Sequence, residues 1–151
     1  MEERSAMINA LSLIDQDTVA IIPFFWGPYK SSIINKDGYY YTQFTAYELL
    51  DEKCVQFDST LKGRQDAAAR KLKIYKPPVI VEPKKIGFFP TTSSSNPDCV
   101  WISQHPFTLT NENEKNKCIL HYTEDLEIPV NISKWTVSKQ YERLKYLLGG
   151  S

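Results

Sequence analysis

The segment of residues 76–103 constrains the fold more than any other part of this 151-residue sequence. Two short apolar runs, 79–82 and 86–89, are each enclosed by prolines, and a third apolar run begins at residue 99. Proline has a fixed φ and no amide proton, so it marks positions where a strand has to end. A polar loop of Thr, Ser and Asn, residues 91–96, separates the second and third runs. The segment therefore predicts short, rigidly bounded strands that present a loop.

Similar short runs predict the remaining strands. The apolar, β-branched run 18–25 has strand length, and residues 31–34 and 39–42 form a hairpin in which Asp37-Gly38 would supply the positive φ of a tight turn. The full set of predicted strands beyond this hairpin is 79–82, 86–89, 100–109, 118–123 and 126–131, with a second hairpin turn at Glu124-Asp125.

Two short helices are predicted in the middle of the chain. Thr45 is a suitable N-cap for a helix that runs through Asp51, and Glu48 stands at the third position of a capping box. Residues 64–72, which follow Gly63, contain the strongest local helix formers of the sequence.

A third helix is predicted near the C-terminus. Ser133 is its N-cap, and its apolar residues recur on one face at Val137, Tyr141, Leu144 and Leu148. The fold class is therefore α+β: mainly an antiparallel sheet or a partly open barrel, with one or two short helices and a C-terminal amphipathic helix. Residues 1–151 would form a single domain in this interpretation, with 1–15 poorly ordered and 149–151 a natural tail or a linker.

The charge distribution separates one segment from the rest. The formal net charge is zero, which by itself argues against a polyanionic partner. Residues 62–85 nevertheless carry +6, whereas the preceding residues carry −5 and the following ones −1. Because the local field governs how a polyanion approaches, this basic block is a candidate binding surface. A solvated helix face is the alternative explanation.

The sequence offers little support for catalysis or metal binding. It contains no glycine-rich phosphate loop and no nucleophile elbow. Cys99, His105, Cys118 and His121 lack the spacing of a zinc site, and a Cys99–His105 nucleophile pair lacks a visible third member. We therefore predict no enzyme, no catalytic or metal-binding residues and no cofactor.

The cellular location is predicted from the cysteines and the N-terminus. Three cysteines at unrelated spacings favour a reducing compartment over a disulfide framework. Two acidic residues precede the first apolar stretch, and no run approaches the roughly 20 apolar residues that cross a bilayer. We expect a cytoplasmic, nucleoid-associated protein without a membrane partner.

From about residue 18 to 148 the order of features resembles the ComK family of competence transcription factors. The points of similarity are Cys54 with Phe57, Gly63-Arg64, Lys76-Pro77-Pro78 with Pro83, Phe89-Pro90-Thr91 with Ser93-Ser94, Pro97, Cys99, Trp101-Ile102-Ser103, and the strand at 126–132. The resemblance implies a sequence-specific transcriptional activator of DNA-uptake genes that contacts the minor groove of paired A/T-rich boxes as a dimer or higher oligomer.

Charge and hydrogen-bonding chemistry suggest which residues would contact the DNA. Arginine enters narrow A/T-rich minor grooves, so Arg64 and Arg70 are the predicted groove readers. The predicted phosphate contacts are Lys62, Lys71, Lys76, Lys84 and Lys85, with Ser93, Ser94 and Asn96 as hydrogen-bond donors from the loop. Lys84 and Lys85 lie in the turn between two strands that lead to that loop.

Two alternatives stay open at this point. The chain could be a small β-rich protein-interaction module whose basic block meets an acidic partner. It could also be a truncated, inactive regulator, because family members continue into a C-terminal region that a proteolytic adaptor recognises and this sequence ends before it. Adaptor binding is therefore not expected.

Overall fold

The computed structural model describes residues 2–112, 114–123 and 125–149 of the chain. The elements, in chain order, are α1 (Glu2–Ser12), β1 (Thr18–Trp26), β2 (Tyr29–Asn35), β3 (Gly38–Thr42), α2 (Ala46–Val55), α3 (Leu61–Leu72), β4 (Val79–Glu82), β5 (Ile86–Pro90), β6 (Trp101–Ser103), β7 (Thr108–Asn111), β8 (Cys118–Thr123), β9 (Leu126–Val130) and α4 (Lys134–Leu147). None of the helices in these described ranges is long and apolar enough to cross a membrane.

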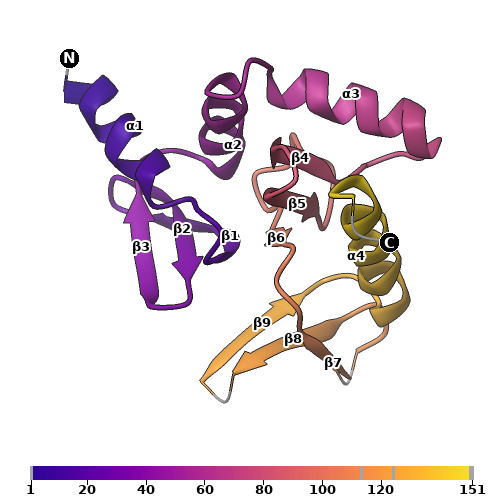
Figure 1. Cartoon of the computed structure of the whole chain (residues 1–151). Coiled ribbons are helices and arrows are strands. Elements are labelled where there is room, and N and C mark those ends of the chain that lie inside the picture. The colour runs from indigo at the N-terminus through magenta and orange to yellow at the C-terminus, as the bar shows by residue number, and fades with distance from the viewer. Residues whose placement is uncertain (1, 113, 124, 150–151) are drawn as a thin grey trace.

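Antiparallel strands dominate the fold. Six of them form one sheet in the order β3-β2-β1-β6-β5-β4, and the other three form a second sheet in the order β7-β8-β9 (Figure 1). The predicted α+β class is thus confirmed. Both sheets are open, which decides between the sheet and the barrel in favour of the sheet, and three helices rather than one or two precede the C-terminal one.

The six-stranded sheet is the middle layer of three. Ile33 and Trp101 belong to a core shared with α1 and α2, whereas Ile34 and Ile102 belong to a core shared with the second sheet and α4. This division follows from the pleat, because consecutive side chains of a strand point to opposite faces. Trp101 is only 1% exposed, as expected for the centre of an apolar run.

The predicted helix caps form. Thr45 and Glu48 make the reciprocal bonds of a capping box, each at 3.1 Å, and α2 continues beyond the predicted end at Asp51 to Val55. The next helix starts earlier than predicted, at Leu61 instead of after Gly63, because the Thr60 hydroxyl accepts a bond from the Gly63 amide at 2.9 Å. Glycine is tolerated there because it lies in the first turn, where the amide has no intrahelical partner.

The cap and apolar face of α4 are also as predicted. The Ser133 hydroxyl accepts a bond from the Thr136 amide, and Val137 and Leu144 are buried. Gly149, with a φ of +86°, ends the helix in the left-handed conformation that glycine favours. Gly150 and Ser151, the rest of the expected tail or linker, lie outside the described residues.

One helix was not predicted. α1 occupies Glu2–Ser12 and buries Met7, Ala10 and Leu11 against the rest of the first core. Residues 1–15 were instead expected to be poorly ordered. The apolar residues have helical spacing, so the signal for a helix is present in the sequence.

The predicted strand at 100–109 is wrong, because it is two strands in different sheets. β6 ends at Ser103 in the six-stranded sheet, and β7 begins at Thr108 in the other. Pro106 lies in the connection, where it has no amide to offer to a ladder. The chain therefore crosses from the middle layer to the second sheet at this point.

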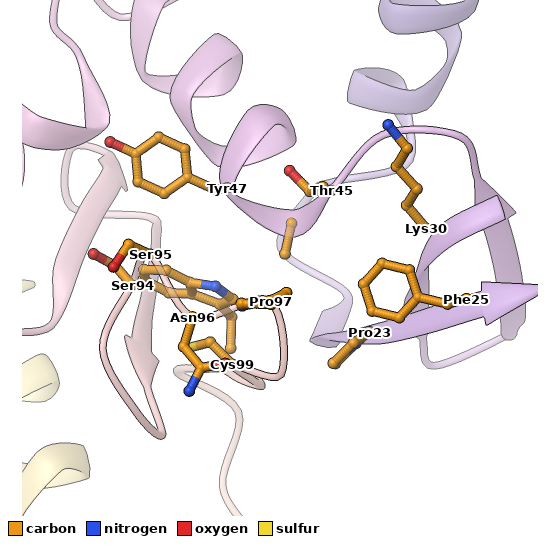
Figure 2. Close-up of a pocket in the computed structure, with 12 residues that line it drawn as sticks. Pro23, Phe25, Lys30, Thr45, Tyr47, Ser94, Ser95, Asn96, Pro97 and Cys99 are labelled. Atoms are coloured by element: carbon orange, nitrogen blue, oxygen red, sulfur yellow. The ribbon is translucent and has the colours of Figure 1, made fainter.

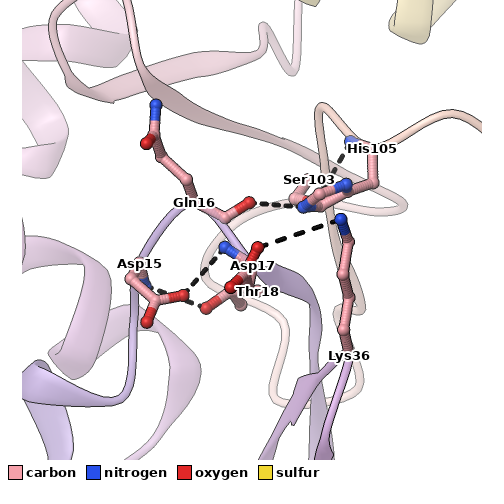
Figure 3. A network of polar contacts seen from close by, with 7 residues as sticks. All are labelled: Asp15, Gln16, Asp17, Thr18, Lys36, Ser103 and His105. Atoms are coloured by element: carbon pink, nitrogen blue, oxygen red, sulfur yellow. Dashed lines mark hydrogen bonds and ion pairs between the residues drawn. The ribbon is translucent and has the colours of Figure 1, made fainter.

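The turn between β2 and β3 was predicted with the wrong backbone. Positive φ is found at neither Asp37 nor Gly38. Contacts with Asp17, the residue before β1, hold the turn instead: the Lys36 amide donates to the Asp17 carbonyl at 3.1 Å, and the Lys36 ammonium lies 3.8 Å from the Asp17 carboxylate (Figure 3). The other predicted hairpin turn includes Glu124, which lies outside the described residues.

Candidate nucleic-acid interface

The predicted contact residues begin on α3, a helix with little buried surface. Leu61 and Ala68 are its two buried side chains, and it runs back above the edge strand β4 (Figure 1). Lys62, Arg70 and Lys71 are exposed on it. Because so narrow a stripe faces the core, most of the helix surface is free to carry charge.

Positive charge is concentrated where α3 ends. Residues 70–76, which we call the basic segment, contain four basic residues and no acidic one. Lys73 is the C-cap, with a φ of 56°, and Lys76 is also left-handed, with a φ of 50°. The four cations are exposed, and within the described ranges none of them forms an ion pair. Their charge is thus available to an anionic ligand.

A buried glutamine of α4 holds the basic segment in place. Gln140 is 4% exposed, and its Nε2 donates to the Lys76 carbonyl at 2.9 Å and to the Pro90 carbonyl at 3.4 Å. Its Oε1 accepts a bond from the Arg143 guanidinium at 3.3 Å. A buried amide needs such partners, and here they join α4 to the end of the basic segment and to the end of β5.

The two predicted groove arginines have different surroundings. Arg70 is exposed, whereas Arg64 is half-buried. The Nη2 of Arg64 donates to the Phe57 carbonyl at 3.0 Å, and its Nε is buried without a hydrogen-bond partner among the described residues. Arg64 thus stabilises the connection between α2 and α3, and only Arg70 presents its whole guanidinium to the outside.

The other predicted lysines lie at the far end of β4 and β5. Lys84 and Lys85 are in the turn after β4, whereas residues 91–96 follow the opposite end of β5, which is about 16 Å away at roughly 3.3 Å per residue. Two of these lysines form ion pairs: the Lys85 ammonium lies 3.6 Å from the Glu82 carboxylate, and the Lys62 ammonium lies 3.3 Å from the Asp66 carboxylate. The predicted residues therefore form two groups, one at each end of these strands.

The polar loop, residues 91–96, lies at the same end of the sheet as Lys76, because Gln140 bonds to the carbonyls of both Lys76 and Pro90. It is internally bonded: the Ser93 and Ser95 hydroxyls are 3.1 Å apart, and Asn96 accepts a bond from the Asp98 amide at 2.8 Å. Figure 2 shows the loop across a cleft from the β1–β2 hairpin, which contributes Phe25. The cleft has a volume of about 330 Å³ and is lined mainly by apolar atoms.

Cys99 and His105, considered in the sequence as a nucleophile pair, lie apart in the structure. Cys99 precedes β6 and is buried, and burial raises the pKa of its thiol. His105 follows β6, where its ring meets the Gln16 carbonyl (Figure 3). The pair is thus split between opposite ends of one strand, and the sulfur is protonated at neutral pH. The part of the chain that the structure describes has no cluster of three or more His, Cys, Asp or Glu side chains suited to a metal ion.

Comparison with known proteins decides the family. A model of the ComK protein family matches residues 10–148. The chain belongs to the ComK family. The competence transcription factor of Bacillus subtilis (strain 168) is 38% identical over 89 residues, which are 57% of this chain and 46% of the length of that relative. No solved structure matches.

Membership of the ComK family confirms the resemblance drawn from the sequence. The relative is named for the control of transcription and not for a reaction, which agrees with the prediction that the chain is not an enzyme. The matched region covers less than half of that relative, so its activity and partners are matters for proposal here.

Sequence reasoning missed three residues of this region. Lys73 was counted in the basic block but not selected, and Tyr75, between two lysines, was not considered. Gln140 also escaped, although it is a polar residue on the apolar face of α4, three positions after Val137 and four before Leu144. A polar residue at such a position signals a buried hydrogen bond and could have identified it.

Proposed function

We propose that this chain is a sequence-specific DNA-binding regulator that activates competence genes. It would read the minor groove of A/T-rich boxes as a dimer or higher oligomer, in the cytoplasm at the nucleoid. The observation that carries the proposal is the exposed basic segment, residues 70–76, of this member of the ComK family: its four cations form no ion pair with the residues that the structure describes. Cations of this kind provide the phosphate contacts that position a protein on a duplex.

The surroundings of each side chain suggest its role on the DNA. Arg70 is the proposed groove reader, because a free guanidinium can enter a narrow A/T-rich groove. Arg64 would have to break its hydrogen bond to the Phe57 carbonyl before it could contact the groove. The proposed phosphate contacts at this end are Lys71, Lys73 and Lys76, with Ser93, Ser94 and Asn96 as hydrogen-bond donors.

The second group of lysines would extend the same contact. Lys62, Lys84 and Lys85 lie at the opposite end of β4 and α3 from the basic segment. The separation of about 16 Å along β5 corresponds to roughly five steps of a DNA strand at 3.4 Å each. A duplex that lies along α3 would therefore reach both groups.

The test is fluorescence anisotropy of the chain with two labelled duplexes across a salt series. One duplex carries spaced A- and T-tracts, and the other is G/C-rich. We expect preference for the A/T-rich duplex and a fall in affinity with salt, with a logarithmic slope of about −5 for the six proposed lysine contacts to phosphates. Equal binding of both duplexes would contradict groove reading and leave only backbone contacts.

An interaction module is the second candidate, because large aromatic side chains are exposed outside the basic segment. Phe25 is 58% and Trp26 is 70% exposed at the tip of the β1–β2 hairpin. Aromatic residues of this kind are enriched at protein interfaces. If the chain binds neither duplex but binds an acidic polypeptide, this candidate replaces DNA recognition. A chain that binds neither ligand would instead fit an inactive regulator.

A further inference from the structure

Tyr75 is the most exposed large aromatic side chain in the described ranges. Its exposed fraction is 94%, compared with 70% for Trp26 and 69% for Trp135. Exposed apolar residues that occur singly are common, so this exposure alone has no functional meaning. The backbone that carries Tyr75 and the charges around it distinguish it from the others.

The backbone on both sides of Tyr75 is held by hydrogen bonds. The Ile74 amide donates to the Ala69 carbonyl at 3.3 Å, and the Lys76 carbonyl accepts the bond from Gln140 at 2.9 Å. Pro77, which follows directly, is buried. The backbones of Lys73 and Lys76 both adopt the left-handed conformation, which residues other than glycine rarely take without support from their surroundings. The loop is thus braced, while the ring of Tyr75 projects from it.

The charges around Tyr75 are all positive within the basic segment. Lys73 and Lys76 stand two residues before and one residue after it, and Arg70 and Lys71 complete the four cations. Proteins that bend or unstack DNA use this combination, in which cations hold the phosphates and an apolar or aromatic side chain enters between bases.

We propose that Tyr75 is an aromatic wedge that stacks on a base at a flexible step of the bound A/T-rich duplex, with Lys73 and Lys76 on the flanking phosphates. This inference rests on the proposed function. TA steps unstack readily, so an A/T-rich box is the sequence on which such a wedge meets the least resistance.

The two exposed aromatic residues of α4 do not share this arrangement. Trp135 lies on α4 with the Lys139 ammonium 5.8 Å from its ring centre, so it already has a cation as partner. Tyr146, also on α4, is 61% exposed and lies outside the basic segment. Tyr146 is therefore a matched control for a tyrosine substitution.

The experiment uses A/T-rich duplexes with 2-aminopurine at successive adenine positions, because this base fluoresces more strongly when it loses its stacking neighbour. We compare the unaltered chain with Tyr75→Ala, Tyr75→Phe and Tyr146→Ala. The unaltered chain, Tyr75→Phe and Tyr146→Ala should each raise the fluorescence at one or a few neighbouring positions. Tyr75→Ala should abolish the rise and weaken binding roughly 5- to 100-fold, as expected for loss of one stacked base.

The salt dependence separates stacking from charge. Tyr75→Ala removes no charge, so its salt slope should equal that of the unaltered chain, and its thermal unfolding should be unchanged because the side chain is exposed. If Tyr75→Ala binds and unstacks the duplex as the unaltered chain does, the wedge is wrong while DNA binding stands. If the unaltered chain binds no duplex, the proposed function fails and the wedge fails with it.

Discussion

α3 and α4 are helices of similar length with opposite roles. α3 has 12 residues and buries Leu61 and Ala68, whereas α4 has 14 residues and buries Val137, Gln140 and Leu144. α4 packs so closely on β5 that a Cβ added to Gly87 would lie 2.5 Å from the Leu144 Cδ1. α3 rests on the sheet edge (Figure 1) and carries four of the eight cations of the basic block, of which Lys62, Arg70 and Lys71 are exposed.

The difference indicates how the fold separates support from recognition. A helix that contributes little to the core can carry like charges close together, because few packing contacts restrict its surface. The well-packed helix stabilises the sheet and, through Gln140, also fixes the last residue of the basic segment. The proposed interface is therefore positioned by a residue that is itself buried, 64 positions away in the sequence.

The largest expected effect is a difference in stability between a truncated side chain of α4 and one of α3. Leu144→Ala removes a side chain that is fully buried and should lower the free energy of unfolding by about 2–5 kcal/mol. Leu72→Ala, at a half-buried position of α3, should cost roughly 1 kcal/mol. Urea denaturation of both variants measures the contrast. Equal losses would mean that α3 supports the core as much as α4 does.

Gln140→Leu tests whether α4 positions the basic segment. The substitution keeps the volume but leaves the Lys76 and Pro90 carbonyls without their donor, which should lower stability by about 1–3 kcal/mol. Affinity for both duplexes should fall, and more for the A/T-rich one, because the loosened loop carries Tyr75 as well as the lysines that contact phosphates. Ser138→Ala, at an exposed position of α4, is the control. Unchanged DNA affinity at reduced stability would limit Gln140 to a role in folding.

The two arginines of α3 provide a third contrast. Arg70→Ala should weaken binding to the A/T-rich duplex by about 1–3 kcal/mol and leave stability within roughly 0.5 kcal/mol. Arg64→Ala should instead lower stability by about 0.5–1.5 kcal/mol, because the bond to the Phe57 carbonyl is lost. Anisotropy and urea denaturation are measured on both variants. A selective loss of A/T-rich binding in Arg64→Ala would assign groove reading to Arg64 after all.

Local signals in the sequence predicted most of the elements. The prolines around β4 and β5 and the caps Thr45 and Ser133 act within a few residues, so their effect can be inferred without tertiary information. The break between β6 and β7 was missed because strand propensity does not show that a chain changes sheets. The relation between α1 and the core likewise depends on contacts with residues far along the chain.

The candidate site was predictable as a composition but not as an arrangement. The basic block is visible in the sequence, yet the register of β5 places Lys84 and the loop that begins at Thr91 at opposite ends of the strand. The bond that engages Arg64 also depends on how α2 and α3 meet. Residue types therefore indicated the chemistry, whereas register and long-range hydrogen bonds determined which side chains are free to act.

The smallest expected effect tests whether one duplex reaches both groups of lysines. Lys76→Ala and Lys84→Ala should each reduce the magnitude of the salt slope by about one, without changing the preference for A/T-rich DNA. In the double variant the magnitude of the salt slope should fall by about two, because the two side chains lie at opposite ends of β4 and act independently. Lys145→Ala on α4, also exposed, should leave the slope unchanged. If Lys84→Ala behaves like Lys145→Ala, the interface is confined to the C-terminal end of α3, and the duplex crosses that helix instead of following it.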